Sequence, residues 1–173
     1  QVDFTFGRTG DPLSVAGVRA TPELFAALKA VPALGRTFTT DEATLGADRV
    51  VVVSHGFWQR SLGADPAVVG QTIQLDAQPF TVVGVMPPGF EFPTSTRVDA
   101  WAPLAFNLKD VHGASRRARS LMVVGRTTPT ASLRQAQEEL SVLASGIARD
   151  YKDSNAGWGG RVIAAREQLV ATA

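Results

Sequence analysis

The sequence of 173 residues contains no cysteine, which removes disulfides, a thiolate nucleophile and cysteine-based metal sites from consideration. Because cytoplasmic proteins and bacterial envelope proteins can both lack cysteine, the compartment stays undecided at this point. No window reaches the roughly 18 apolar residues that a membrane span requires. The chain starts with glutamine and shows no signal-peptide pattern, so we expect an excised or processed piece.

The chain also lacks an excess of charge of either sign. Its 17 basic and 16 acidic side chains give a net charge of +1, too balanced to predict a nucleic-acid groove. Hydrophobic residues make up 45% of the chain and charged residues 19%, which is typical of a globular protein.

Sequence motifs of common catalytic sites are missing as well. There is no phosphate-binding G-x-x-x-x-G-K-[ST] run, no H-E-x-x-H and no G-x-S-x-G, so we predict no cofactor and no metal. The chain has two histidines, His55 and His112. His55 directly follows Ser54, but consecutive helical residues do not face each other. A hydrolase that uses Ser54 or His55 with a carboxylate stays open as the weakest alternative. The acidic candidates for general acid–base work are Asp41, Glu42, Asp99, Glu138 and Glu139.

The elements that we expect describe a mixed α+β chain. Residues 3–20 are predicted to form two strands around a turn, and "RVVVVS" at 49–54 a buried strand followed by a helix with Ser54 as its cap. "QTIQL" and "FTVVGV" flank a short turn, which predicts a hairpin.

The clearest predicted helix runs from residue 130 to residue 151, between strands expected at 120–127 and 161–170. Ser132 and Gln135 have the spacing of a capping box. The apolar side chains step by three or four residues, which predicts a stripe that faces a core: Leu133, Ala136, Leu140, Leu143, Ile147 and Tyr151.

Two groups of residues are candidates for contact with a partner or substrate. Phe90 and Phe92 follow the turn Pro87-Pro88-Gly89. They can cover the end of the hairpin as core residues, which we favour, or form an exposed binding patch. The basic cluster Arg116, Arg117 and Arg119 could meet anionic lipid headgroups or an acidic partner, although a solvated loop is the simpler interpretation.

Four consecutive segments, "PALGR", "VVVVSHGFWQR", "DPAVVGQTI" and "TVVGVMPPGFEFP", closely resemble the periplasmic core domain of MacB-like ABC transporter permeases of the MacB/FtsX type. The resemblance is strong over residues 15–106 and weaker to the end. It implies a porter-like split β-α-β subdomain, here residues 1–48 with 118–173, and a smaller inserted mixed α/β, hairpin-rich subdomain, here residues 49–117.

The resemblance further implies a non-catalytic domain on the periplasmic or extracytoplasmic face of the bacterial inner membrane. The full-length protein would be anchored by membrane helices and would couple cytoplasmic ATP hydrolysis to export or to regulation of a partner. The implied partners are a second copy of the permease, a cytoplasmic ABC ATPase, and a periplasmic adaptor or other envelope protein. The alternative is a free-standing envelope module that binds peptide or glycan.

Overall fold

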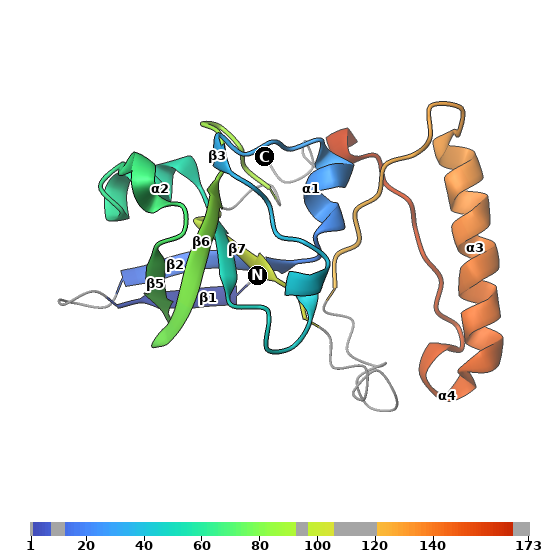
Figure 1. Cartoon of the computed structure of the whole chain (residues 1–173). Helices are drawn as coiled ribbons and strands as arrows, with labels where there is room; N and C mark the ends of the chain where they lie inside the picture. Colours follow the sequence, from blue (N-terminus) through green and yellow to red (C-terminus); the bar gives the residue numbers. More distant parts are fainter. Residues whose placement is uncertain (1, 8–12, 93–96, 106–120, 168–173) are drawn as a thin grey trace. The chain divides into compact units, whose positions relative to one another are not determined.

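The computed structural model describes residues 2–7, 13–92, 97–105 and 121–167 (Figure 1). The chain forms two compact units, Gln1–Asn107 and Leu108–Ala173. Strands build most of the first unit, and the regular elements described in the second unit are helices. Among the described helices, none has the length and hydropathy needed to cross a membrane.

The strands of the first unit belong to one sheet. They are β1 (Val2–Phe6), β2 (Leu13–Ala20), β3 (Leu34–Gly35), β4 (Val50–Val53), β5 (Thr72–Leu75), β6 (Gln78–Val85) and β7 (Ala100–Pro103). Its helices are α1 (Glu23–Leu28), α2 (His55–Ser61) and two 3-10 turns, η1 (Asp41–Ala43) and η2 (Pro66–Val68). The predicted strand pair in residues 3–20, the buried strand at 50–53 and the hairpin are confirmed.

This sheet closes on itself into a small barrel. The strand order is β3-β6-β4-β7-β2-β1-β5, and β5 also pairs with β6, so all strands except β3 form a ring. The narrowest seam joins β1 to β5 through one pair, Phe6 with Leu75. Beside it, the Asp76 backbone N–H donates to the Thr5 carbonyl, and the Thr5 N–H donates to Asp76 Oδ1, both at 2.8 Å. A side-chain oxygen therefore supplies part of the ladder that closes the barrel.

Alternate residues of the central strands point to the two sides of the barrel wall. On β4, Val51 and Val53 pack in the interior cluster, whereas Val52 packs in a second cluster outside. This two-sided burial explains why β4 reads as an unbroken apolar run. On β7, Ala100 and Ala102 face inward and Trp101 faces outward.

The interior cluster is rich in aromatic rings, and small inward side chains leave room for them. Phe4 and Phe80 lie 6.3 Å apart between ring centroids. Phe57 of α2 meets Phe6 edge-on at 5.4 Å. Because Phe57 is buried in the same cluster as the strand residues, α2 covers one end of the barrel.

Helix α3 (Leu133–Asp150) dominates the second unit, with the short α4 (Lys152–Asn155) after it. The predicted capping box of Ser132 and Gln135 is confirmed. Further along, Gln137 fastens the returning chain to α3: its Nε2 donates to the Gly160 carbonyl at 2.9 Å, and its Oε1 accepts from the Val162 N–H at 2.8 Å. A Cβ on Gly160 would lie 2.7 Å from Leu140 Cδ2, so glycine permits this close approach.

The predictions that flank α3 are wrong for the described residues. Residues 121–127 form no strand; residues 161–164 are also outside any strand, and 165–167 are helical. Neither segment joins the sheet that the described strands form, and the Val162 N–H, which a strand ladder would use, donates to Gln137 Oε1 instead. The stripe of α3 is not in a core either, since none of its residues is buried.

The mixed α+β class is therefore confirmed, whereas the described residues do not form a split β-α-β arrangement around α3. Strands β1 and β2, which we assigned to the porter-like part, share the barrel with β4 to β7 of the predicted insert. The division of the chain at residues 48 and 49 stays a prediction.

Candidate functional site

The corner after β6 is fastened to the outer cluster of the barrel. Its turn is closed by the Phe90 N–H, which donates to the Pro87 carbonyl at 3.2 Å, with Gly89 at a φ of 77°. Phe90 then packs on Trp101, with 5.4 Å between the ring centroids. The Trp101 Nε1–H donates to the Phe92 carbonyl at 2.9 Å. This geometry is that of a packed corner.

Both predicted contact phenylalanines are half-buried rather than exposed. Phe90 belongs to the edge of the outer cluster, and Phe92 is held through its backbone. The predicted basic contacts Arg116, Arg117 and Arg119 lie outside the described residues, and so does His112. A role of these residues in binding a partner stays a prediction.

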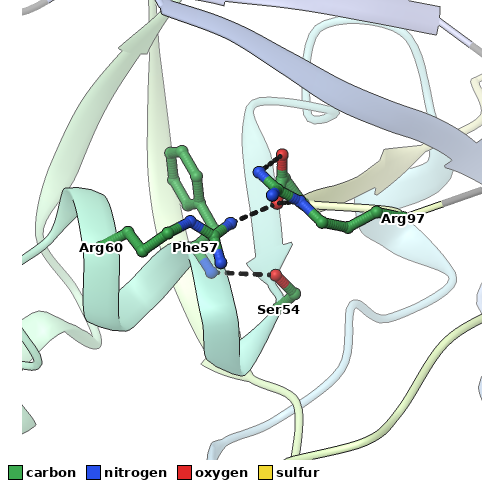
Figure 2. A network of polar contacts seen from close by, with 5 residues as sticks. Ser54, Phe57, Arg60 and Arg97 are labelled. Atoms are coloured by element: carbon green, nitrogen blue, oxygen red, sulfur yellow. Dashed lines mark hydrogen bonds and ion pairs between the residues drawn. The ribbon is translucent and has the colours of Figure 1, made fainter.

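A second candidate site surrounds a buried carboxylate on the return to the barrel (Figure 2). The Asp99 side chain is 3% exposed. Its Oδ1 accepts from Arg60 Nη2 at 2.9 Å and from Arg97 Nε at 3.0 Å, and its Oδ2 accepts from Arg97 Nη2 at 3.1 Å. Two arginines, from α2 and from the segment before β7, thus converge on one carboxylate.

The backbone around Asp99 fixes this carboxylate in place. Its N–H donates to the Ala16 carbonyl at 2.7 Å, and its carbonyl accepts from the Ser54 N–H at 2.8 Å. Ser54 in turn caps α2, because its Oγ accepts from the Phe57 N–H at 3.1 Å (Figure 2). The site therefore joins β2, the end of β4 and the start of α2.

The same contacts set the electrostatics of the site. The Asp99 carboxylate raises the pKa of Arg97 above the ordinary value of an arginine, first by accepting its hydrogen bonds and second by its negative charge. A carboxylate this deeply buried needs such partners, because an uncompensated buried charge is costly. Arg60 and Arg97 supply more than one unit of opposite charge.

Sequence reasoning found only part of this site. It named Asp99 as an acidic candidate and Ser54 as a cap but missed both arginines. Arg97 precedes Asp99 by two residues, and in an extended segment such residues share a side, so this pair was detectable. Arg60 is 39 residues away in the sequence, and only the fold brings it to Asp99.

The arrangement offers little for hydrolysis. Ser54 and His55 are not hydrogen-bonded to each other; instead, the His55 ring meets Trp58 edge-on at 5.3 Å. A triad needs a base within hydrogen-bond reach of the nucleophile. Within the residues that the structure describes, no three His, Asp or Glu side chains gather in a way that could hold a metal ion.

The strands and helices define a mixed α+β domain built on a closed barrel. The chain belongs to the family of MacB-like periplasmic core domains, which matches residues 1–143. It is thus the periplasmic core domain of a MacB-like ABC transporter permease and lies on the periplasmic or extracytoplasmic side of the membrane. Domains of this family are generally non-catalytic.

Solved structures share the fold at low sequence identity. The periplasmic region of MacB from Actinobacillus actinomycetemcomitans is 15% identical, with a TM-score of 0.57, over 92% of this chain and 74% of that one. A domain of a putative permease protein from Porphyromonas gingivalis is 12% identical, with a TM-score of 0.54, over 88% of this chain and 63% of that one.

The extracellular domain of the noncanonic ABC-type transporter YknZ from Gram-positive bacteria is 18% identical, with a TM-score of 0.48, over 60% of this chain. The match spans 50% of the YknZ chain, so this chain corresponds to about half of it. No curated protein matches the chain.

Proposed function

We propose that this domain is the outer element of a permease that couples cytoplasmic ATP hydrolysis to export, or to the regulation of a partner outside the membrane. The single observation that carries the proposal is the family match over residues 1–143. In this role the domain performs no chemistry itself. It works with a second copy of the permease, a cytoplasmic ABC ATPase, and an adaptor or other envelope protein.

The physical character of the first unit supports a mechanical role. A force-transmitting element must move as a body, which requires a core that does not deform easily. The barrel has a tightly packed aromatic interior, and protein interiors of this kind have low compressibility. The seam at Phe6 and Leu75 closes the sheet, so the ring has no free edge there.

The test uses the absence of cysteine from this chain. In the full-length protein, on a background free of other cysteines, Val31→Cys introduces a thiol at an exposed position. A membrane-impermeant maleimide should label this thiol in cells whose inner membrane is intact. Val51→Cys, which is fully buried in the barrel, is the matched control and should not react.

Coupling is tested in the same background by following disulfide formation between Val31→Cys copies. Inactivating the ATPase should change the rate at which this disulfide forms, because the two outer domains then stay in one arrangement. Labelling that requires rupture of the inner membrane would overturn the location. Labelling in intact cells with a disulfide rate independent of the ATPase would instead favour a static envelope-binding module.

A further inference from the structure

Asp99 differs from three other paired carboxylates of the described chain in the number of its cationic partners. Arg19 with Asp48, Arg36 with Glu42 and Arg134 with Glu138 are one-to-one pairs. Asp99 has both Arg60 and Arg97 within 3.0 Å. The cluster therefore holds two positive charges against one negative charge.

The excess charge is accessible, whereas the carboxylate is not. The Arg60 side chain is 47% exposed and the Arg97 side chain 65% exposed, while Asp99 lies beneath them. Each guanidinium carries five N–H donors, and Asp99 accepts three hydrogen bonds from the two groups together. Solvent thus reaches two neighbouring guanidinium groups that a common acceptor holds in place.

The sequence of α2 accommodates the position of Arg60. A Cβ added to Gly56 would lie 2.6 Å from Arg60 Nη1, so the guanidinium rests where a larger residue would project. Glycine is less favourable than alanine in a helix, because it loses more conformational freedom on folding. Gly56 therefore lowers the stability of α2 somewhat but leaves room for the Arg60 side chain to fold back toward Asp99.

We propose that Arg60 and Arg97 form a binding site for a phosphate group, with Asp99 as the internal acceptor that orients them. The planar guanidinium fork matches phosphate oxygens, and each charge-assisted hydrogen bond is stronger than a neutral one. A phosphate group offers up to three acceptor oxygens, which lets it reach both guanidinium groups at once, whereas the two oxygens of a carboxylate are already satisfied by one guanidinium. The site is independent of the coupling role proposed above.

The first experiment is an NMR titration of the 173-residue chain with inorganic phosphate at pH 7.5, with sodium chloride adjusted to keep the ionic strength constant. The wild-type amide signals of Arg60, Arg97 and Asp99 should shift together and saturate. Arg97→Gln should raise the apparent Kd about tenfold or more, as expected for losing hydrogen bonds to a charged group. Asp99→Asn should lower the Kd, because the amide oxygen still accepts hydrogen bonds from the arginines while the negative charge that repels the phosphate is removed.

Arg36→Gln is the matched control, because it also removes one guanidinium hydrogen-bonded to a carboxylate, but from a one-to-one pair. It should leave the Kd unchanged. An equal loss of affinity in Arg36→Gln and Arg97→Gln would mean general attraction of anions and would overturn the proposal. So would a wild-type chain that shows no saturable shifts. If Asp99→Asn fails to fold, the comparison of Arg36→Gln with Arg97→Gln still decides whether the proposed site binds phosphate.

The source of the phosphate group is distinguished by two further ligands under the same conditions. Glycerol phosphate represents a soluble phosphomonoester, and short-chain phosphatidylglycerol below its micelle concentration represents a lipid phosphodiester. Tighter binding of the lipid than of inorganic phosphate, lost in Arg97→Gln, assigns the site to headgroups. Tighter binding of the monoester or of inorganic phosphate assigns it to soluble ligands, and acetate binding as well as phosphate would refute the phosphate assignment.

Discussion

Gly84 of β6 allows β3 to approach closely, and its replacement by alanine should loosen this edge of the barrel. The added Cβ would clash with the Arg36 carbonyl oxygen and would lie 3.1 Å from the Leu34 carbonyl oxygen. Both obstacles are backbone atoms, so no side-chain rotation relieves them. We expect the residues of β3 to detach from β6 in the Gly84→Ala variant.

The magnitude follows from the contacts that detachment would break. The Ala33 N–H donates to the Val85 carbonyl at 2.8 Å, and the Arg36 N–H donates to the Val83 carbonyl at 2.9 Å. At about 1 kcal/mol for each bond, with about 1 kcal/mol more for partial exposure of Leu34, the loss is roughly 3 kcal/mol. Alanine also reduces the conformational entropy of the unfolded chain, which offsets about 0.4–1 kcal/mol of this loss. Gly84→Ala should therefore lower the free energy of unfolding by about 2 kcal/mol.

Urea unfolding followed by tryptophan fluorescence measures this loss, and two other glycines serve as controls. Gly89 has open space around its Cα but a φ of 77°, so Gly89→Ala should cost only the backbone term of about 1 kcal/mol. Gly7 has open space around its Cα and no positive φ, so Gly7→Ala should leave the free energy of unfolding unchanged or raise it slightly. A Gly84→Ala protein as stable as wild type, or more stable than Gly89→Ala, would refute the steric reasoning.

Four further predictions concern other contacts. Ala77→Gly should raise the free energy of unfolding by about 1 kcal/mol in urea titrations, because Ala77 has a φ of 57° in the β5–β6 turn. Phe57→Ala should lower it by about 3–5 kcal/mol in the same assay, since this buried ring covers the barrel end. A hydrogen bond from the Arg36 guanidinium lowers the pKa of Glu42. The stabilisation of the folded state by the ionised Glu42 is therefore present above the unfolded carboxyl pKa and is lost as pH falls through the folded pKa. The free energies of unfolding of wild type and Glu42→Gln should differ at pH 7 and converge at acid pH. Gln137→Ala should speed amide hydrogen exchange at Val162, with no change at Val51, because only the former N–H donates to this side chain.

The sequence could predict the elements whose signals are local. β4 is an unbroken apolar run, Ser54 is a helix cap, and the β5–β6 hairpin has a short turn between alternating strands; each of these features is decided by neighbours in the chain. The closed barrel was not predictable in this way. Its seam depends on a single pair, Phe6 with Leu75, and on the side chain of Asp76, which no periodicity reveals.

The region around α3 shows the opposite failure. Residues 121–127 have the composition of a strand, and α3 has a regular apolar stripe, yet among the described residues the former join no strand ladder and the latter is not buried. Propensity predicts what a segment can form, whereas a ladder or a core needs a second surface. The prediction of the Asp99 site was incomplete for a related reason, because Arg60 reaches Asp99 only through the fold.

The direction of the strands places the start of β1 and the end of β7 toward the same end of the barrel. β1 begins level with the start of β7, since Val2 and Ala100 both pair with Gly17, and β7 runs on alongside β2 to Pro103. The chain thus enters and leaves the barrel toward the same end. Only β2 lies between β1 and β7, so these two points are about 10 Å apart. Helix α2, through Phe57 and Phe6, lies at the other end. Under the coupling role proposed above, we expect a displacement at these two points to produce a larger movement at α2, because α2 lies at the opposite end of the barrel.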